Sequence, residues 1–427
     1  MAEIEKTSET NAAPVAAKPA KKVSAGATAL RQVVTDVYAA AWDAKRRGEP
    51  VGWSSSKFPC EIAEALGLAV VYPENQAAGI AAQHDGERLC QAAEDMGYDA
   101  DICGYARISL AYAAGVETTN ESRRMPQPDF VLCCNNICNC MTKWYENIAR
   151  MHNIPLVMID VPYNNTVEVS DSNVAYIRGQ FDDAIKQLEV ISGRKFDQNK
   201  FDEACANANR TAKAWLRVCD FLQYKPSPMS GFDLFNHMAD VVTARGKVAA
   251  AEAFELLATE MDENIRTGTS TLPFPEQHRI MFEGIPCWPE LKSLFKPLKA
   301  NGLNVTAVVY APAFGFVYNN MDEMMRAYCK APNSVCLEQG VDWREGICRD
   351  NKVDGVLVHY NRSCKPWSGY MAEMQRRFTK DLGVPCIGFD GDQADPRNFN
   401  EAQYETRVQG LVEAIEATKA AKEEGKA

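Results

Sequence analysis

Three cysteines stand at points of the sequence where a helix is expected to begin. Cys138 and Cys364 each follow an apolar, strand-like run and a short polar loop, and Cys103 precedes the helix-like run from Ile108 to Ala114. The first backbone N–H groups of a helix have no partner within the helix, so such positions favour an anion, including a thiolate. The three cysteines are therefore candidate metal ligands. Each taken alone fits a core residue better, because free cysteines are among the most buried residue types.

The surroundings of two of these cysteines are repeated along the chain. Each has the pattern Asn-x-x-Cys after the predicted strand, at Asn135 to Cys138 and at Asn361 to Cys364, followed by a Trp, a helix and a second strand. We interpret the repetition as two α/β domains of one design. Open α/β sheets bind ligands at the carboxyl ends of their strands. Two cysteines that meet there across a domain cleft suggest a shared metal site.

Other candidate residues follow predicted strands in the first third of the chain. Ser55 and Ser56 end a short strand, and Glu74 comes just after the strand of residues 68–72. The serines could cap a helix or donate hydrogen bonds to a ligand at the sheet edge. Glu74 could be a general base or a solvated loop residue. The residues alone leave these alternatives open.

Two further residues are weaker candidates for the same site. Cys140 forms a Cys-x-Cys pair with Cys138 and is an alternative ligand. His359 stands near the end of a predicted buried strand, where a core histidine is as good an interpretation as a site residue.

Several common cofactor motifs are absent from the sequence. It has no Gly-x-x-x-x-Gly-Lys-Ser/Thr loop, no convincing Gly-x-Gly-x-x-Gly, no paired Cys-x-x-Cys and no compact ferredoxin-type run of cysteines. Three dispersed thiolates can instead hold a [4Fe–4S] cluster and leave one iron open, and an open coordination position is the mark of a catalytic metal. A zinc site, or a structural protein without a cluster, remains open on the residues alone.

Composition restricts the class of protein. A chain of 427 residues that is 46% hydrophobic is long enough for two or three domains with large cores. Its net charge of −11 argues against a general nucleic-acid binder. No apolar run of 18 residues predicts a membrane span, and the first 27 residues lack the apolar core of a signal peptide. Fifteen cysteines in such a chain indicate a reducing cytoplasm.

The pattern of apolar residues divides the chain into four parts. We expect a mobile tail (1–27), a first α/β domain (28–168), a helical segment (169–275) and a second α/β domain (276–427). The predicted fold class is α/β, with two similar doubly wound domains of the flavodoxin or Rossmann kind and the helical segment between them.

Four motifs together resemble the 2-hydroxyacyl-CoA dehydratase family, which also includes benzoyl-CoA reductase subunits. The resemblance extends over nearly the whole chain after the tail. The size and the helical middle are most similar to the lactoyl-CoA dehydratase α subunit, and the 2-hydroxyisocaproyl-, phenyllactoyl- and 2-hydroxyglutaryl-CoA enzymes are close alternatives. The motifs are Trp53-Ser54-Ser55-Ser56-Lys57-Phe58-Pro59, Tyr72-Pro73-Glu74-Asn75, Cys134-Asn135-Asn136-Ile137-Cys138 with Lys143-Trp144-Tyr145-Glu146, and His359 through Arg362-Ser363-Cys364-Lys365-Pro366.

The resemblance implies an αβ heterodimer with a homologous β subunit and a separate, ATP-dependent iron–sulfur activator that injects one electron. The thioester carbonyl of a 2-hydroxyacyl-CoA, lactoyl-CoA in the favoured case, would become a ketyl radical anion. Hydroxide would then leave from C2, a proton would be lost from C3, and the electron would be recycled as the 2-enoyl-CoA departs.

Carried onto this sequence, the resemblance assigns roles to six residues. Cys103, Cys138 and Cys364 would hold a [4Fe–4S] cluster with one open iron. Ser56, or its neighbour Ser55, would hydrogen-bond at the open site, and Glu74 would lie near the leaving hydroxyl or the moving proton. Two other functions fit the same residues: an aryl-CoA reductase subunit, whose electrons end in the ring, and a non-catalytic subunit that only relays electrons.

Overall fold

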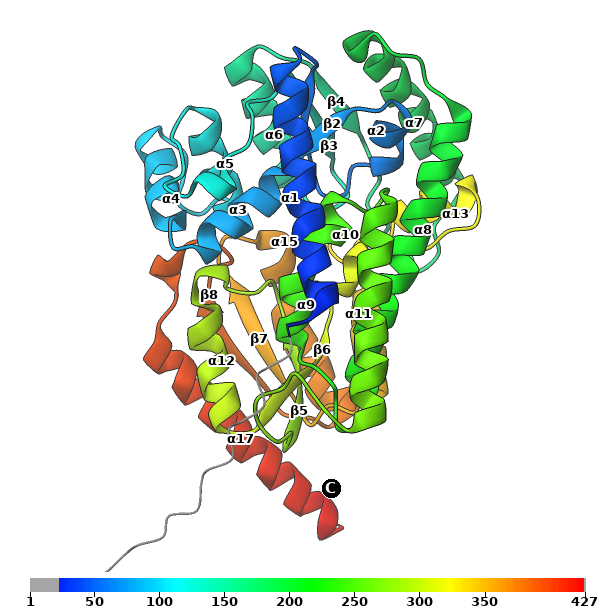
Figure 1. Cartoon of the computed structure of the whole chain (residues 1–427). Helices are drawn as coiled ribbons and strands as arrows, with labels where there is room; N and C mark the ends of the chain where they lie inside the picture. Colours follow the sequence, from blue (N-terminus) through cyan, green and yellow to red (C-terminus); the bar gives the residue numbers. More distant parts are fainter. Residues whose placement is uncertain (1–22, 426–427) are drawn as a thin grey trace, which may run out of the picture.

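Two four-stranded parallel sheets form the framework of the computed structural model, which describes residues 23–425 (Figure 1). The first sheet has the strand order β2-β1-β3-β4 and the second has the order β6-β5-β7-β8, so the two sheets have the same topology. The predicted fold class, α/β with two similar units, is confirmed. Their strands are β1 (Val51–Ser54), β2 (Ala69–Val71), β3 (Phe130–Cys134), β4 (Leu156–Ile159), β5 (His278–Glu283), β6 (Leu303–Val308), β7 (Gly355–Asn361) and β8 (Cys386–Gly391).

Strands β1, β3, β5 and β6 are buried along their whole length, as expected for parallel sheets that carry helices on both faces. Such strands appear in the sequence as continuous apolar runs, which is why β3 and β7 were predictable. All the strand pairs are parallel, so the carboxyl ends of the strands in each sheet lie at one edge.

Helices of the first unit connect its strands and carry several of the candidate residues. Pro73 opens a helix directly after β2, at the position where a missing N–H costs nothing. Glu74 therefore lies in the first turn of this helix and not in a loop, the alternative that the sequence had left open. The helices are α2 (Cys60–Ala65), α3 (Pro73–Ala82), α4 (Gly86–Asp95), α5 (Gly104–Ala113) and α6 (Asn139–His152).

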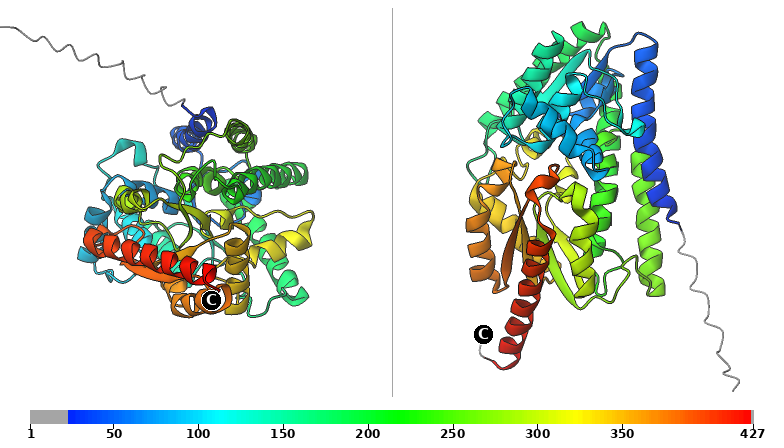
Figure 2. Two further views of the ribbon diagram at one scale, coloured as in Figure 1. Left: turned by 90° about the horizontal axis from the view of Figure 1, so that it is seen from below. Right: turned by 90° about the vertical axis from the view of Figure 1, so that its left-hand side faces the viewer.

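Long helices span the two sheet units. In Figures 1 and 2, α1 (Ala25–Arg46) and α11 (Val248–Thr267) lie side by side, and Glu260 of α11 accepts hydrogen bonds from the first N–H groups of α1. Residues 1–22 of the predicted tail lie outside the described residues, and α1 includes the last three tail residues. Besides α11, the helices between β4 and β5 are α7 (Asp171–Ser192), α8 (Gln198–Asp220), α9 (Gly231–His237) and α10 (Ala239–Thr243).

Helices of the second unit surround its sheet, and α17 closes the described chain. They are α12 (Leu291–Ala300), α13 (Met321–Tyr328), α14 (Leu337–Asp350), α15 (Lys365–Ser368), α16 (Met371–Arg377) and α17 (Glu401–Glu423). None of the described helices combines the length and the apolar character that crossing a membrane requires.

The two units share their hydrophobic cores. One cluster of buried side chains includes Phe130 of β3 together with Phe282 of β5. A second cluster includes Val131 of β3 together with Val356 of β7. Because each cluster draws on both sheets, the edges that carry the candidate residues are held against each other by apolar packing.

Candidate functional site

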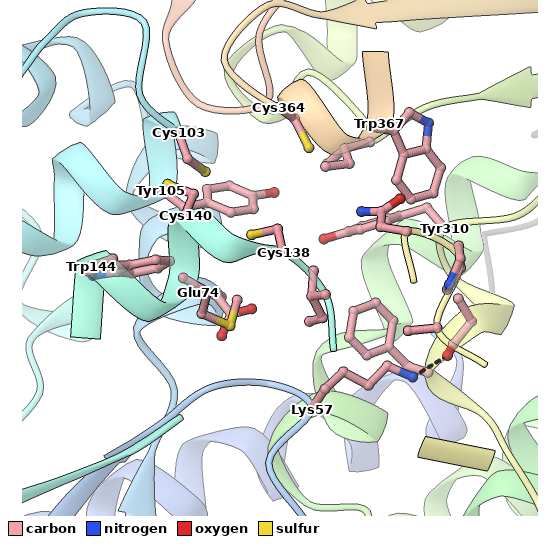
Figure 3. A pocket seen from close by; sticks show the side chains of 18 residues that line it. Lys57, Glu74, Cys103, Tyr105, Cys138, Cys140, Trp144, Tyr310, Cys364 and Trp367 are labelled. Atoms are coloured by element: carbon pink, nitrogen blue, oxygen red, sulfur yellow. Dashed lines mark hydrogen bonds between the residues drawn. The ribbon is translucent and has the colours of Figure 1, made fainter. Parts of the chain in front are cut away.

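One pocket brings together candidate residues from both sheet units (Figure 3). It contains sulfur atoms from three separate stretches of the chain, two tyrosines, two charged side chains and an otherwise apolar wall. The residues that line it include Cys103, Cys138, Cys140, Cys364, Tyr105, Tyr310, Lys57, Glu74, Ile137, Met141, Trp144, Phe314 and Trp367. The structure thus places all three predicted cysteine ligands, and the alternative Cys140, around one space.

Each of the three predicted ligands is the residue just before a helix. Cys103 precedes α5, Cys138 precedes α6 and Cys364 precedes α15. Cys138 follows β3 and Cys364 follows β7, so the two repeated units deliver their cysteines from the carboxyl ends of equivalent strands. Their asparagines brace the loops, because Asn135 accepts a hydrogen bond from the Val161 N–H at 2.7 Å. Asn361 performs the same task for the Ile285 N–H at 3.0 Å.

The pKa values of the three cysteine thiols are not lowered, although a position at a helix start alone would lower them. First-turn N–H groups do lower the pKa of the thiols, but burial and the neighbouring thiols outweigh them. The pKa of Cys103, of Cys138 and of Cys364 is therefore raised above its ordinary value. Thiolates would form in this pocket only against a positive counter-charge, which is what iron supplies to a thiolate ligand.

The loop after β8 supports Cys103 from the other unit. Gln393 donates hydrogen bonds to the sulfur of Cys103 at 3.4 Å and to the hydroxyl of Ser363 at 2.9 Å. The Ser363 hydroxyl in turn accepts the N–H of Gly104 at 2.9 Å. Gln393 is not among the residues predicted for the site, and the only signal for it in the sequence is its place at the carboxyl end of a predicted strand.

Glu74 lines the pocket of the sulfur atoms and is hydrogen-bonded to Ser56, which is not among the lining residues of this pocket but lines a neighbouring one together with Glu74. The carboxylate of Glu74 accepts the Ser56 N–H at 2.7 Å and the Ser56 hydroxyl at 2.6 Å. Burial raises the pKa of Glu74 to about 7, although the hydrogen bonds from Ser56 oppose the shift. A carboxyl group with a pKa near neutrality can both accept and release a proton at physiological pH.

Ser55 and His359 lie outside the lining of this pocket. The Ser55 hydroxyl accepts the N–H of Cys134 at 3.0 Å, which ties the end of β1 to β3. His359 is fully buried, stacks on Phe389 with 4.7 Å between ring centroids, and its Nδ1 lies 2.6 Å from the Ile285 carbonyl. Burial lowers the pKa of His359 to about 4. The structure places His359 as a neutral core residue.

Aromatic side chains complete the wall, and none of them was among the residues predicted for the site. Tyr105 and Tyr310 direct their hydroxyls toward the middle of the pocket, and Trp367 packs at its edge (Figure 3). Tyr105 follows Cys103 by two residues and Trp367 follows Cys364 by three. The repeated Trp after each cysteine was the one available signal.

The donor set fits an iron–sulfur cluster better than a single metal ion. Within residues 23–425, no group of three or more His, Cys, Asp or Glu side chains is arranged to hold one ion. In a cluster each thiolate binds a different iron, so the sulfur atoms surround a larger space than a zinc site does. Four cysteines around one pocket, with no histidine among its lining residues, are the ligand type that such clusters use.

Comparison with known proteins places the chain in an enzyme family. Residues 55–415 match the family described as 2-hydroxyglutaryl-CoA dehydratase, D-component. The α subunit of (R)-2-hydroxyglutaryl-CoA dehydratase from Acidaminococcus fermentans is 64% identical, over 93% of this chain and 98% of that protein. The chain belongs to the 2-hydroxyacyl-CoA dehydratase family. The resemblance drawn from the four motifs is therefore confirmed, and this dehydratase subunit is part of a hydro-lyase.

Two other relatives bear on the alternatives raised from the sequence. The α subunit of lactoyl-CoA dehydratase from Anaerotignum propionicum is 40% identical, over 89% of this chain and 94% of that protein. A benzoyl-CoA reductase subunit from Thauera aromatica is 24% identical, over 81% of this chain and 83% of that protein. The dehydratase relatives are thus much more similar to this chain than the reductase is.

Proposed function

We propose that this chain is the catalytic α subunit of an (R)-2-hydroxyacyl-CoA dehydratase that carries a [4Fe–4S] cluster on Cys103, Cys138 and Cys364. The observation that carries the proposal is the convergence of these cysteines, from both sheet units, on one pocket beside the Ser56–Glu74 pair. When bound, such a cluster would supply a Lewis-acidic iron at its open corner and a place for the activating electron.

The protein's own side chains have separable tasks in this reaction. Ser56 fixes the orientation of the Glu74 carboxylate through two hydrogen bonds. Glu74, with a pKa raised to about 7, would accept the C3 proton and could pass it to the departing hydroxide. The apolar wall formed by residues such as Met141, Trp144 and Phe314 would exclude bulk water from a reactive intermediate.

The proposal includes partners and a compartment. The relatives' names describe α subunits, which supports a homologous β subunit for this chain. We further assign to it a transient, ATP-dependent iron–sulfur activator as electron donor. We place the enzyme in the cytoplasm, because its fifteen cysteines are all free and a reducing compartment keeps thiols in that state.

Anaerobic iron and sulfide determination, with a visible spectrum, tests the cluster directly. The chain produced with its β subunit should be brown and contain four irons per α-subunit cluster in addition to any on the partner. Cys103→Ala, Cys138→Ala and Cys364→Ala should each lose this iron and the activity, whereas Cys140→Ala should retain both. A colourless, fully active wild type would refute the proposal. If Cys140→Ala loses the iron and Cys138→Ala retains it, while Cys103→Ala and Cys364→Ala still lose it, Cys140 is the third ligand in place of Cys138.

The reaction type has its own test. With the activator present, a dehydratase turns over many substrate molecules per electron because the electron is recycled. We expect (R)-2-hydroxyacyl-CoA thioesters, with the 2-hydroxyglutaryl and lactoyl compounds assayed first, to give the 2-enoyl-CoA without net electron consumption. Stoichiometric electron consumption on an aryl-CoA would instead identify a reductase. Iron-dependent electron transfer with no substrate turnover would identify a relay protein.

A further inference from the structure

Two tyrosines and a tryptophan form a chain of hydrogen bonds at the junction of the two sheet units. The indole N–H of Trp288, which follows β5, donates to the hydroxyl oxygen of Tyr105 in the first turn of α5. The Tyr105 hydroxyl is in turn hydrogen-bonded to that of Tyr310, which follows β6. Both hydroxyls point into the pocket that the cysteines line (Figure 3).

The first member of this chain sets the order of its donors. An indole can only donate, so the Tyr105 oxygen accepts from Trp288 and its own O–H is left to donate. Burial raises the pKa of Tyr310 and the hydrogen bond from Tyr105 opposes the shift, which identifies Tyr105 as the donor of that bond. Within residues 23–425, no hydrogen bond takes the proton of the Tyr310 hydroxyl. The chain therefore ends in an unused O–H donor, strengthened because hydrogen bonds in series polarise one another.

Tyr310 lies close to both the carboxylate and the sulfur atoms of the site. It lines the sulfur pocket and the neighbouring pocket, as Glu74 does. Besides burial, the charges on Glu74, Cys364 and Cys103 raise its pKa, so the hydroxyl stays protonated at physiological pH. An O–H that holds its proton this firmly can donate a hydrogen bond but cannot serve as an acid near pH 7. Its action on a substrate is then electrostatic.

Negative charge develops in this pocket during the proposed reaction. The electron from the activator enters the thioester carbonyl, and the carbonyl oxygen carries the charge until hydroxide leaves C2. Lys57 is the basic residue among the lining residues, but burial lowers its pKa well below the ordinary value and its Nζ donates to the Ala313 carbonyl. A fixed O–H donor in such an apolar pocket stabilises a developing oxyanion far more than it would in water.

We propose that the Tyr310 hydroxyl donates a hydrogen bond to the thioester carbonyl oxygen and stabilises the negative charge that develops there. The inference rests on the proposed dehydratase function and adds a catalytic residue to it. Tyr105 and Trp288 are positioning residues, because they orient and polarise the donor. No bond to Tyr310 forms or breaks, and its proton stays on its oxygen throughout. The electron comes from the activator and is returned when the 2-enoyl-CoA leaves.

Kinetics of the holoenzyme, with its β subunit and activator, give the first test. The substrate is whichever of (R)-2-hydroxyglutaryl-CoA and (R)-lactoyl-CoA the wild type dehydrates faster. Tyr310→Phe should lower kcat by on the order of a hundredfold with a much smaller change in KM, because the full charge is absent from the bound substrate. Tyr105→Phe should lower kcat by a smaller factor. The control is Tyr112→Phe, also on α5, which removes a hydroxyl that donates to the Met125 carbonyl at 2.8 Å outside the pocket lining and should leave kcat unchanged.

A spectroscopic measurement locates the hydrogen bond on the substrate. The substrate carries carbon-13 at the thioester carbonyl, and infrared difference spectra are recorded without the activator, so that no turnover occurs. A hydrogen bond to a carbonyl weakens the C=O bond and lowers its stretching frequency. The bound carbonyl should therefore absorb at a higher frequency in Tyr310→Phe than in the wild type. Tyr105→Phe should shift it in the same direction by less, and Tyr112→Phe should match the wild type.

Two results would overturn the inference and leave the dehydratase function intact. One is a Tyr310→Phe enzyme with normal iron content and the kcat of the wild type. The other is a lowered kcat with an unchanged carbonyl frequency, which would place the hydroxyl on a different atom of the substrate. If Tyr310→Phe does not fold, Tyr105→Phe decides, because an unchanged carbonyl frequency in that variant also overturns the inference. A wild type that dehydrates neither thioester would contradict the proposed function itself.

Discussion

At the scale of single residues, Glu74 is a carboxyl of the pocket lining whose environment differs strongly from that of a surface carboxyl. Burial raises its pKa to about 7, and two hydrogen bonds from Ser56 fix its orientation. If Glu74 moves the C3 proton, Glu74→Gln should lower kcat by roughly a hundredfold or more with little change in KM. Steady-state kinetics with the β subunit and activator provide the measurement.

Iron content and spectrum are the controls for the Glu74 variant. Both should match those of the wild type, because the substitution leaves every cysteine in place. The matched comparison is Glu64→Gln, which removes a carboxyl paired with Lys247 at 2.7 Å outside the pocket lining and should leave kcat unchanged. Normal turnover by Glu74→Gln would exclude an acid–base role for this residue.

Asp240 is a second carboxyl with a raised pKa, and it lies outside the pocket lining. It is 2% exposed, one of its carboxylate oxygens has no hydrogen-bond partner, and burial raises its pKa to about 8. Between pH 4 and 8 the folded protein therefore holds a proton that the unfolded chain releases. The stabilising contribution of the neutral form is fully present below about pH 4 and is lost as the pH rises to about 8, with a slope of at most about 1.4 kcal/mol per pH unit.

Asp240→Asn tests this linkage. The neutral amide cannot ionise, so the unfolding temperature of the variant should be close to that of the wild type at pH 5 and clearly higher at pH 9. Thermal unfolding followed by circular dichroism at both pH values gives the comparison. Asp182→Asn, at an exposed carboxyl on α7, is the control and should show no such pH-dependent gain. An identical pH dependence in Asp240→Asn and the wild type would contradict the assignment.

At the scale of elements, much of the site could be predicted because it follows from local patterns. The apolar run before Cys364 predicted a strand, and β7 extends from Gly355 to Asn361. The repeated Asn-x-x-Cys placed Cys138 and Cys364 correctly at the ends of equivalent strands. Helix α3 was not predicted, and Glu74 was left as a possible loop residue, because the weak amphipathic pattern of residues 73–82 gives little sign of a helix.

The contacts that could not be predicted are those between elements distant in the sequence. Lys57 is buried by Phe314 and Phe316, more than 250 residues away, and no local pattern distinguishes it from a surface lysine. Gln393 reaches Cys103 from the other sheet unit, 290 residues along the chain. Periodicity reports which face of an element is buried, but the partner across the interface depends on how the two units pack.

That contact between units leads to a prediction for the cluster. The N–H group of Gln393 points at the sulfur of Cys103 at 3.4 Å, and hydrogen bonds to cluster sulfurs stabilise the reduced, more negative state. Gln393→Leu should therefore shift the reduction potential of the bound cluster to more negative values while the iron content stays normal. Redox titration followed by electron paramagnetic resonance measures this shift.

Gln375→Leu is the matched control for the redox experiment. Gln375 donates its hydrogen bond to the Tyr360 hydroxyl on the same sheet unit and is absent from the pocket lining. Its loss should leave the potential unchanged. If Gln393→Leu has the wild-type potential, the hydrogen bond to Cys103 does not act on the cluster.

At the scale of the whole molecule, the site is a junction between the two sheet units. Cys103, Cys138 and Cys140 come from the first unit, and Cys364 comes from the second. The junction also holds a buried ion pair, in which Arg107 of α5 lies 2.8 Å from Asp395 after β8. A group bound at such a junction should stabilise the folded chain, because the ligand set exists only when both units are in place.

Removal of the metal tests this coupling. Stripping the iron anaerobically with a chelator should lower the unfolding temperature of the wild type by roughly 5 °C or more. Cys364→Ser removes the single cysteine that the second unit contributes to the pocket lining, so chelator treatment should leave the unfolding temperature of this iron-depleted variant nearly unchanged. Cys386 is also in the second unit but lies outside the pocket lining. On iron removal, Cys386→Ser should show the same fall in unfolding temperature as the wild type. If iron removal leaves the wild-type unfolding temperature unchanged, the cluster does not stabilise the contact between the two units. The shared apolar cores and the ion pairs would then hold the units together without it.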